Sequence, residues 1–406
     1  MISKKKALIG GIILVIITSI ATLTIGNYIG LRLGDNYLIS KEYLEQYREI
    51  EEDFSKVIFA RDFLLEKYYQ ELDKDVLMEG AVEGIFNATD DPYTVYMSPS
   101  EYESFTTETE GSFGGIGIIV TPGDDGFVTI VSPIEGTPGD RAGLRTGDKI
   151  LQVDGQDIEG RRLDKAVDLM RGEPGTEVEI VIRREDQREL IEITIEREII
   201  KIETVQYELM EDQLGYIRIT NFNQQTARDF RGALESLERQ GMEGLVLDLR
   251  NNPGGLLNQT IQIADMLLDE QVIVFTEDRD GTRREQRSNR SHVDVPLTVL
   301  VNRGSASASE ILAGAVQDGG RGLIIGETTF GKALVQSIQE FEDDGSAFRY
   351  TVSQYFTPSG NNIQDAGIEP DIEISLEEDL RVDQIEDGMD FQLDRAIEEL
   401  LKALEN

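Results

Sequence analysis

The residues that could do chemistry are concentrated between positions 303 and 336. A serine-rich turn, Ser305 to Ser309, precedes an apolar helical pattern, and Phe330-Gly331-Lys332 follows that pattern. The chain has one histidine and no cysteine, so a thiolate nucleophile is excluded. If the chain does nucleophilic chemistry, a serine with a lysine base is the economical solution, and Lys332 follows Ser307 by 25 positions.

The turn at Ser307 has two interpretations. It would begin the expected helix Ala308–Gln317, where free N–H groups and the positive end of the helix dipole can stabilise an oxyanion. Ser307 and Glu310 also match a capping box, in which both side chains only satisfy donors at the helix start. On this motif alone capping is the commoner role, because caps far outnumber nucleophiles.

Lys332 can act as a base only if it is neutral. An exposed lysine titrates near ~10.4, so burial by apolar neighbours such as Phe330 and Val335 would have to lower its pKa. The alternative base is the one histidine, His292, which would form a Ser-His-Asp triad with a neighbour such as Asp294. Because His292 lies in a polar loop, we expect it to be a bystander.

The segment around Lys332 also invites comparison with a phosphate-binding loop. Gly326 to Ala333 is one residue short of the pattern G-x-x-x-x-G-K followed by Ser or Thr. Ala333 lacks the hydroxyl that would bind magnesium, and the residues after it favour a strand over a helix. We therefore do not expect a nucleotide site.

The composition limits the function classes further. The chain has 406 residues, enough for two or three cores, and its 39% hydrophobic content is not that of a disordered protein. One histidine and no cysteine argue against a zinc hydrolase, and we expect neither a metal nor a cofactor. The net charge of −39 opposes binding to nucleic acid. Its simplest interpretation is solubility.

The N-terminus predicts the compartment. Lys4 to Lys6 precede an apolar run from Ala7 to Ile25, about the length that a membrane-spanning helix needs. Because basic residues stay on the cytoplasmic side, we expect a single-pass anchor in the cell membrane with the catalytic part outside the cytoplasm. The alternative is a signal peptide cleaved near Ser19-Ile20-Ala21, which would make the protein secreted.

A middle section has the marks of a peptide-binding domain. Residues 140–155 closely resemble the A-G-L-x-x-G-D-x-I-x-x-V-x-G signature of PDZ domains. Such domains add a peptide strand to a sheet edge and hold its terminal carboxylate with backbone N–H groups. The loop that resembles this carboxylate site is formed by Gly115, Ile116, Gly117 and Ile118. We expect the groove helix at Leu163–Met170, and Arg171 after it is a candidate for coupling to the neighbouring domain.

Helical patterns lie at both ends of the chain. Apolar residues follow a 3.6-residue period from Asn36 to about Tyr102, and a helix is predicted over Asp73–Asn87. After about Glu377 a terminal helix carries an apolar stripe between Phe391 and Leu401. Either segment could pack on its own chain or pair with a second copy, so a homodimer is one expected alternative.

From about Ile199 to Leu376 the pattern alternates between strands and helices, which predicts an α/β domain. The expected strands are Leu214–Thr220, Gly244–Leu249, Leu297–Val301, Leu323–Gly326, Val335–Phe341 and Ala347–Tyr355. The expected helices are Thr226–Gln240, Asn258–Leu268 and Ala308–Gln317. Ser307 therefore lies where a strand turns into a helix.

Ser307, Lys332 and Gln336, with the Arg250–Gly255 segment upstream, resemble the C-terminal processing peptidases, the tail-specific proteases of peptidase family S41. The resemblance covers nearly the whole chain after about residue 40. It implies a ClpP/crotonase-like protease domain with an inserted PDZ domain. The implied sections are a basic tip and anchor at 1–30, a helical segment at 36–105, the PDZ domain at 106–198, the catalytic domain at 199–376 and a C-terminal helical segment at 377–406.

The resemblance also implies a role for each site residue. Ser307 corresponds to the nucleophile, Lys332 to the base, and Gln336 to the residue that orients the base. The oxyanion donors would be the N–H of Ala308 and a glycine of the 253–255 turn, taken as Gly254.

We therefore expect a serine endopeptidase that recognises the apolar C-terminal tails of protein substrates through its PDZ domain and cleaves them through an acyl-enzyme. The alternative is a catalytically silent PDZ adaptor at the cell envelope. The expected partners are protein or peptide substrates and the membrane, and nucleic acid is not among them.

Overall fold

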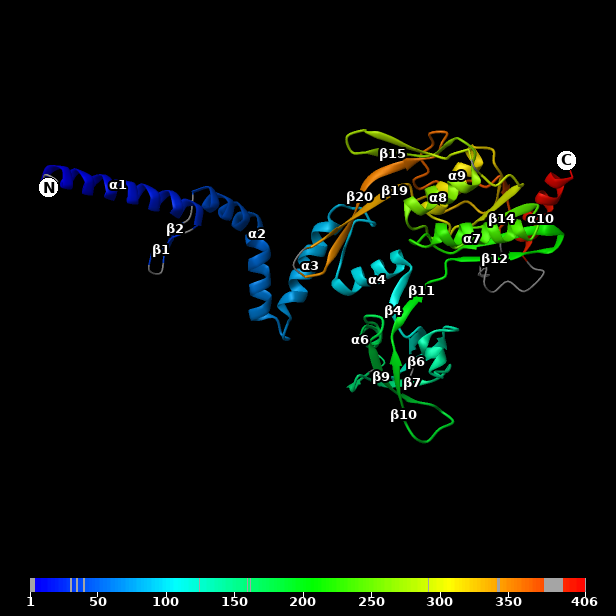
Figure 1. Ribbon diagram of the computed structural model, residues 1–406, viewed down its shortest axis with the longest axis horizontal. Helices are drawn as coiled ribbons and strands as arrows, with labels where there is room; N and C mark the ends of the chain where they lie inside the picture. The colour runs from blue at the N-terminus through cyan, green and yellow to red at the C-terminus, as the bar shows by residue number, and fades with distance from the viewer. Residues whose placement is uncertain are drawn as a thin grey trace. The chain divides into compact units, whose positions relative to one another are not determined.

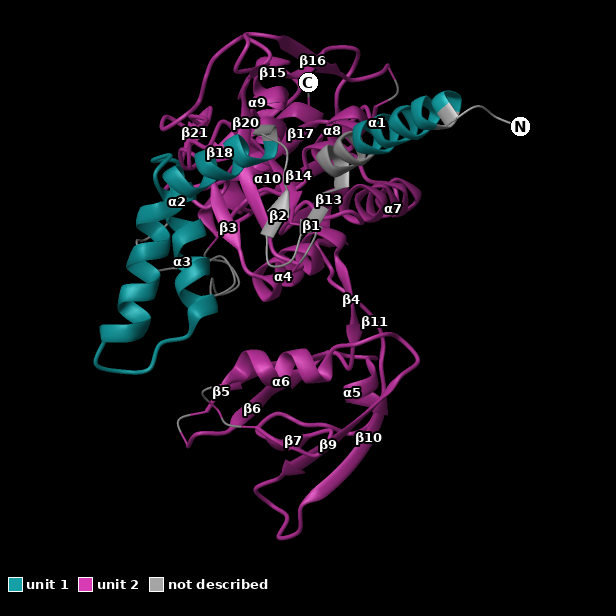
Figure 2. Ribbon diagram, turned by 90° about the vertical axis from the view of Figure 1, so that its left-hand side faces the viewer, with its two compact units in different colours: residues 1–92 teal, residues 93–406 magenta. Residues whose placement is uncertain are grey.

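The computed structural model describes residues 4–405 apart from 30, 34–35, 39–40, 124, 159, 161, 291, 342–343 and 376–389. The chain forms two compact units, Met1–Pro92 and Tyr93–Asn406, which Figure 2 distinguishes by colour. The expected start of the C-terminal segment, at residue 377, lies outside the described residues.

The first unit is almost entirely helical. Its elements are α1 (Lys4–Ile29), β1 (Leu31–Leu33), β2 (Asn36–Leu38), α2 (Lys41–Lys67) and α3 (Lys74–Asn87). Helix α3 starts where the sequence predicted, because the Asp73 side chain accepts the Asp75 N–H at 2.8 Å. The apolar stripe of α2 is exposed, including Tyr47, Phe54 and Phe63.

The N-terminal apolar run is helical, as α1. In the part of the chain that the structure describes, however, no helix has both the length and the hydropathy that a bilayer span requires. The predicted transmembrane anchor is therefore not supported.

The second unit begins with a short strand and a helix and then enters a small sheet domain. These elements are β3 (Val95–Met97), α4 (Pro99–Glu110), β4 (Ser112–Gly115), β5 (Ile118–Pro122), β6 (Val128–Pro133), α5 (Pro138–Arg141), β7 (Lys149–Val153), β8 (Gln156–Asp157), α6 (Leu163–Met170), β9 (Glu177–Arg183), β10 (Ile191–Glu196) and β11 (Glu198–Lys201). The small sheet has the order β10-β9-β7-β6-β5, with β8 beside β7. Strands β4 and β11 pair with each other and connect this domain to the rest of the unit (Figure 1).

The larger part of the second unit is an α/β domain. Its elements are β12 (Val205–Leu209), a 3₁₀ turn (Glu211–Gln213), β13 (Leu214–Ile219), α7 (Thr226–Arg239), β14 (Gly244–Asp248), α8 (Leu257–Leu267), β15 (Val272–Asp278), β16 (Arg283–Arg287), β17 (Leu297–Val301), α9 (Ala308–Asp318), β18 (Leu323–Gly326), β19 (Leu334–Glu340), β20 (Ala347–Phe356), β21 (Ile372–Glu373) and α10 (Phe391–Leu404). The predicted strands and helices of this domain are confirmed to within a few residues. The hairpin β15–β16 is not predicted, because β16 reads Arg-Arg-Glu-Gln-Arg and is exposed throughout.

The main sheet has the order β12-β13-β14-β17-β18-β21, and all its pairs except β12–β13 are parallel. Its central strands are buried on both faces, as the alternation of their side chains shows. Leu245, Leu247 and Val299 join the core with helices α7, α8 and α9. Val246 and Leu300 point the other way, into the core with α10.

Helix α10 covers the second face of the main sheet. Ala396 and Leu400 of its apolar stripe are buried against Val246, Leu300 and Ile325. Of the two alternatives for the C-terminal stripe, the structure therefore shows packing within the chain.

A second sheet has the order β16-β15-β20-β19, and Lys332 lies just before the start of β19. Strand β3 also pairs with β20, so that Val95 lies opposite Arg349. This pairing carries the start of the second unit to the strand next to β19.

Candidate active site

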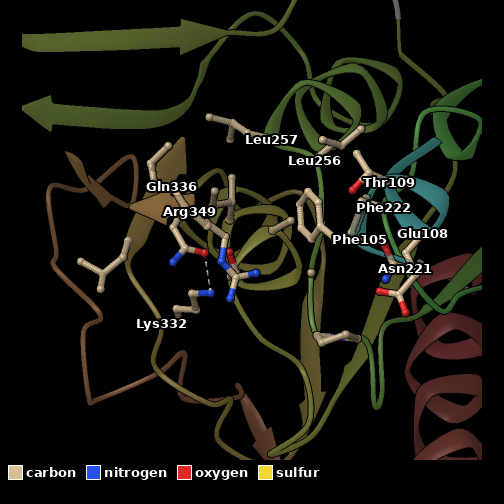
Figure 3. Close-up of a pocket in the computed structure, with 18 of the residues that line it drawn as sticks. Phe105, Glu108, Thr109, Asn221, Phe222, Leu256, Leu257, Lys332, Gln336 and Arg349 are labelled. Carbon is tan, nitrogen blue, oxygen red and sulfur yellow. Dashed lines mark hydrogen bonds between the residues drawn. The ribbon is translucent and has the colours of Figure 1, made fainter. Parts of the chain in front are cut away.

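Three neighbouring parallel strands, β14, β17 and β18, end at the candidate site. The carboxyl ends of parallel strands share one edge of a sheet, which is where loops can build a site. The loops after these strands carry Gly254, Ser307 and Lys332, in that order. All three residues, together with Gln336, line one cavity of about 300 Å³, and Figure 3 shows Lys332 and Gln336 side by side in it.

The backbone of Ser307 is unusual. Its φ of 55° and ψ of −110° are rare for a residue with a side chain and store about 1–3 kcal/mol of strain. The Ser307 N–H donates to Glu310 Oε2 at 2.7 Å, which is the Glu310 half of the predicted capping box, and the Glu310 N–H donates to the Ser307 carbonyl oxygen at 2.9 Å. The two interpretations of Ser307 are thus compatible, since the residue that begins the helix also lines the cavity.

Glu310 is a fully buried carboxylate that links the two sides of the site. Besides Ser307, it accepts the hydroxyl of Thr329 at 2.6 Å and the N–H groups of Gly331 at 2.7 Å and Lys332 at 2.9 Å. Burial raises the pKa of Glu310, and these four hydrogen bonds act in the opposite direction. The carboxylate therefore fixes the backbone of Ser307 relative to the backbone of Lys332.

Tyr355 on β20 also links Ser307 and Lys332, through their backbone carbonyl oxygens. Its hydroxyl lies 3.0 Å from the Ser307 carbonyl oxygen and in close hydrogen-bond contact with the Lys332 carbonyl oxygen. A phenol has one proton, so it donates to one carbonyl at a time. Burial raises the pKa of Tyr355 well above its ordinary value, as does the nearby Glu310, so the phenol remains a donor.

The side chain of Lys332 contacts an amide and an aromatic ring, whereas its backbone N–H binds a carboxylate. Its Nζ donates to Gln336 Oε1 at 3.2 Å, and Gln336 Nε2 donates to the Tyr93 carbonyl oxygen at 2.7 Å. The same Nζ lies 4.2 Å from the centre of the Tyr93 ring. The sequence analysis missed Tyr93, because Pro92-Tyr93 carries only a turn signal and its contact with Gln336 spans 243 positions.

The predicted oxyanion donors lie next to Ser307. A Cβ on Gly254 would sit 2.8 Å from the Ala306 carbonyl oxygen and 3.0 Å from Ser307 Cβ, so only glycine fits at this φ of +105°. The Gly254 N–H, however, donates to Asn252 Oδ1 at 2.9 Å. Among the hydrogen bonds of the described residues, none uses the N–H of Ala308 or Gly255, and both residues line the cavity.

Three family models match separate parts of the chain. The model of peptidase family S41 matches residues 213–374, a PDZ domain model matches 129–184, and the model of the activating protease CtpB N-terminal domain matches 20–100. The carboxy-terminal processing protease CtpA of Bacillus subtilis (strain 168) is 38% identical over 325 residues, which cover 80% of this chain and 69% of that relative.

The chain belongs to peptidase family S41. The carboxy-terminal-processing protease of Bartonella bacilliformis is 41% identical over 74% of this chain and 70% of its own length. Among solved structures, the photosystem II D1 C-terminal processing protease is 33% identical, with 82% and 92% of the two chains covered and a TM-score of 0.46. An S41 protease of Bacteroides fragilis is 16% identical at a TM-score of 0.50, with 83% and 92% covered, which concerns the fold alone. As an enzyme, the chain is a carboxy-terminal processing serine peptidase.

The PDZ domain of this S41 peptidase contains the predicted carboxylate loop. Gly115 ends β4, Ile116 is buried in the PDZ core, and Ile118 begins β5. Gly117 has a φ of +71°, and a Cβ there would meet Thr137 at 2.4 Å, so the position requires glycine. Arg171 follows α6 and lies 5.2 Å from the ring centre of Phe113 on β4, the strand that leads into the PDZ domain.

The sequence offered two other candidates, His292 as a base and a phosphate-binding loop at Lys332. His292 Nδ1 is 3.3 Å from the Arg290 carbonyl oxygen, and His292 is not among the residues that line the cavity. Lys332 is followed by strand β19 and not by a helix, so the loop is not a phosphate-binding loop. Over the described ranges, no group of histidine or acidic side chains is arranged to hold a metal ion.

Proposed function

We propose that this S41 peptidase is a serine endopeptidase in which Ser307 is the nucleophile, Lys332 the general base and Gln336 the residue that orients the base. The observation that carries the proposal is that these three residues line one cavity, with Lys332 Nζ donating to Gln336 Oε1. A hydrogen bond to a third group is the usual means of orienting a base toward its nucleophile.

The reaction follows from these roles. Neutral Lys332 takes the proton of the Ser307 hydroxyl as Oγ attacks the carbonyl carbon of the scissile peptide bond. The resulting ammonium then gives that proton to the leaving amine, which releases the C-terminal product and leaves an acyl-enzyme on Ser307. Water, activated by the neutral lysine, hydrolyses the ester and restores the hydroxyl.

The tetrahedral intermediate needs two donors for its oxyanion. The Ala308 N–H is one, since it lies in the first turn of α9, where the N–H groups have no partner within the helix. The second comes from the glycine pair after β14. Gly254 can donate to the oxyanion if its N–H gives up its hydrogen bond to Asn252 Oδ1. Gly255 can donate without such a change, because its N–H takes part in none of the hydrogen bonds of the described residues.

The PDZ domain supplies the substrates in this proposal. The loop from Gly115 to Ile118 holds the free carboxylate of an apolar C-terminal tail, and the preceding chain reaches Ser307. Arg171 couples the two domains through Phe113. The exposed apolar side chains of α2 favour a homodimer. The basic and apolar N-terminus favours export of the catalytic part out of the cytoplasm.

The test is cleavage of an unfolded protein that ends in an apolar tail. We expect the wild-type chain to cut it, and Ser307→Ala and Lys332→Ala each to lower kcat/KM by about 10⁴-fold or more. The same protein with its tail carboxylate amidated should be cut more slowly, because the PDZ loop loses its anion. Equal cutting by all three enzymes, or none by any, would refute the assignment. Equal rates on both tails would refute only the capture role.

A further inference from the structure

Tyr93 contacts both side chains that are assigned to the base. Its carbonyl oxygen accepts Gln336 Nε2 at 2.7 Å, and the centre of its ring lies 4.2 Å from Lys332 Nζ. Tyr93 is the first residue of the second unit, and the chain continues directly into β3, which pairs with β20. Thr94 also accepts the Thr351 N–H at 3.2 Å. The position of Tyr93 beside the base is therefore set by backbone pairing.

The contact between the ring and Lys332 depends on the charge of the amine. The face of a tyrosine ring carries the negative part of a quadrupole and attracts a cation within about 6 Å of its centre. A neutral amine gains far less from the same position. Tyr93 therefore stabilises the protonated form of Lys332 relative to the neutral form, and partial burial of the ring strengthens the effect.

Other charged groups also face this part of the cavity. Glu310 on α9 directs its carboxylate at the backbone of Lys332, where four donors already bind it. Arg349 on β20 lines the same cavity, and Figure 3 shows it on the side of Lys332 and Gln336. Glu108 on α4 lines the cavity as an exposed residue. These groups are unchanged by a substitution of the Tyr93 side chain.

We propose that Tyr93 is a positioning residue of the catalytic centre, whose carbonyl holds Gln336 and whose ring stabilises the ammonium that Lys332 becomes when it takes the Ser307 proton. The proposal rests on the proposed roles of Ser307 and Lys332. Tyr93 itself gains and loses no atom. In the step that it assists, the proton moves from Ser307 Oγ to Lys332 Nζ.

The ring acts in opposite directions at low and high pH. Above the acidic limb of the pH–rate profile, the lysine starts neutral, so the ring favours only the ammonium that forms on proton transfer and raises the rate. Below that limb, the ring favours the ammonium of the resting enzyme and removes the base. Loss of the ring should therefore lower the plateau of the profile and also move its acidic limb to lower pH.

The experiment compares Tyr93→Leu and Tyr93→Phe with the wild-type chain. The rates measured across pH are kcat/KM for a tailed substrate and the rate at which a fluorophosphonate modifies Ser307. For Tyr93→Leu we expect the plateau to fall about threefold to tenfold and the limb to move down by about half to one pH unit. Tyr93→Phe keeps the ring face and should follow the wild type on both counts.

The matched control is Tyr96→Leu. Tyr96 lies on β3, three positions from Tyr93. The centres of the Tyr96 and Phe341 rings are 6.2 Å apart, and Tyr96 is not among the residues that line the cavity. This variant tests whether a leucine in the segment disturbs the site by loosening β3, and we expect its limb to stay in place.

Two outcomes would overturn the inference while leaving the proposed function intact. One is a Tyr93→Leu profile that drops at every pH with its limb unmoved, which is what a purely structural role produces. The other is the same shift of the limb in Tyr96→Leu. A wild-type chain that neither cleaves the substrate nor reacts with the fluorophosphonate would overturn the proposed function, and the inference with it.

Discussion

Two buried polar clusters lie at the carboxyl ends of the central strands, and they differ in charge and in what they touch. The Glu310 cluster, made of Glu310, Thr329 and Tyr355, binds the backbone of both Ser307 and Lys332. The Arg250 cluster, made of Arg250, Asp248, Asp390 and Tyr216, lies just after β14 and binds the start of α10. Each contains a buried carboxylate and a tyrosine hydroxyl, that of Tyr355 or of Tyr216.

The Arg250 cluster is ionic. The Arg250 guanidinium is 1% exposed and binds Asp248 at 2.7 Å and Asp390 at 2.9 Å. Burial acts to lower the pKa of Arg250, but its two carboxylate partners raise it above the ordinary value. Asp390 also caps α10 by accepting the Leu393 N–H at 3.0 Å. This cluster therefore ties the terminal helix to the sheet.

The Glu310 cluster contains one carboxylate with neutral donors and no cation. An arginine or lysine partner would have cancelled its charge, whereas four N–H and O–H donors distribute it over the loops at Ser307 and Lys332. The comparison teaches that a buried charge can serve attachment or alignment, according to whether its partners are ions or backbone donors. Four substitutions, two of them a matched pair, test that distinction.

The largest expected effect on stability comes from Arg250→Met. Removing the guanidinium leaves the buried Asp248 and the partly buried Asp390 without their cation, which should lower the free energy of unfolding by about 3–5 kcal/mol. Urea denaturation measures this loss. The kcat of the protein that remains folded should stay near the wild-type value, and a loss of kcat larger than that of Glu310→Gln would contradict the division of roles.

Glu310→Gln should lower kcat more than Arg250→Met does and lower the free energy of unfolding less. The amide has one acceptor oxygen and an NH₂ donor, so two of the four donors around it would face another donor. We expect kcat to fall about 100-fold, because the loops at Ser307 and Lys332 lose their alignment, and the free energy of unfolding to fall by about 1–3 kcal/mol. Steady-state kinetics beside urea denaturation separates the two quantities. An activity within a few-fold of wild type would show that Glu310 is only a helix cap.

The smallest effects are expected from the two tyrosines, which form a matched pair. Tyr216 donates to Asp248 at 2.7 Å, and Tyr355 donates to the carbonyl oxygens of Ser307 and Lys332. The two variants are Tyr216→Phe and Tyr355→Phe. Each loses one buried hydrogen bond, so the free energy of unfolding should fall by about 1 kcal/mol in both. Only Tyr355→Phe should lower kcat, by about threefold to tenfold. Equal kcat values for the two variants would remove Tyr355 from the alignment of the site.

Much of the domain organisation and of the site was predictable from local patterns. The PDZ signature, the strand-to-helix turn at Ser307 and the spacing to Lys332 and Gln336 all lie within short stretches of sequence. The membrane anchor was expected from composition and length, and the described helices do not support it. The hairpin β15–β16 has no hydrophobic alternation, so no local signal announces it.

The sequence by itself determined which residues could be nucleophile, base and orienting group, because their types and spacing are local properties. Only the tertiary structure decided what surrounds them. Glu310 could be predicted as a cap but not as a link to Lys332, and Tyr355 and Tyr93 could not be predicted at all. Their contacts depend on which strands pair and in which register, and pairing of β3, β19 and β20 joins segments far apart in the chain. Side-chain periodicity encodes the exposed and buried faces of a strand, but it does not encode the neighbour on that face.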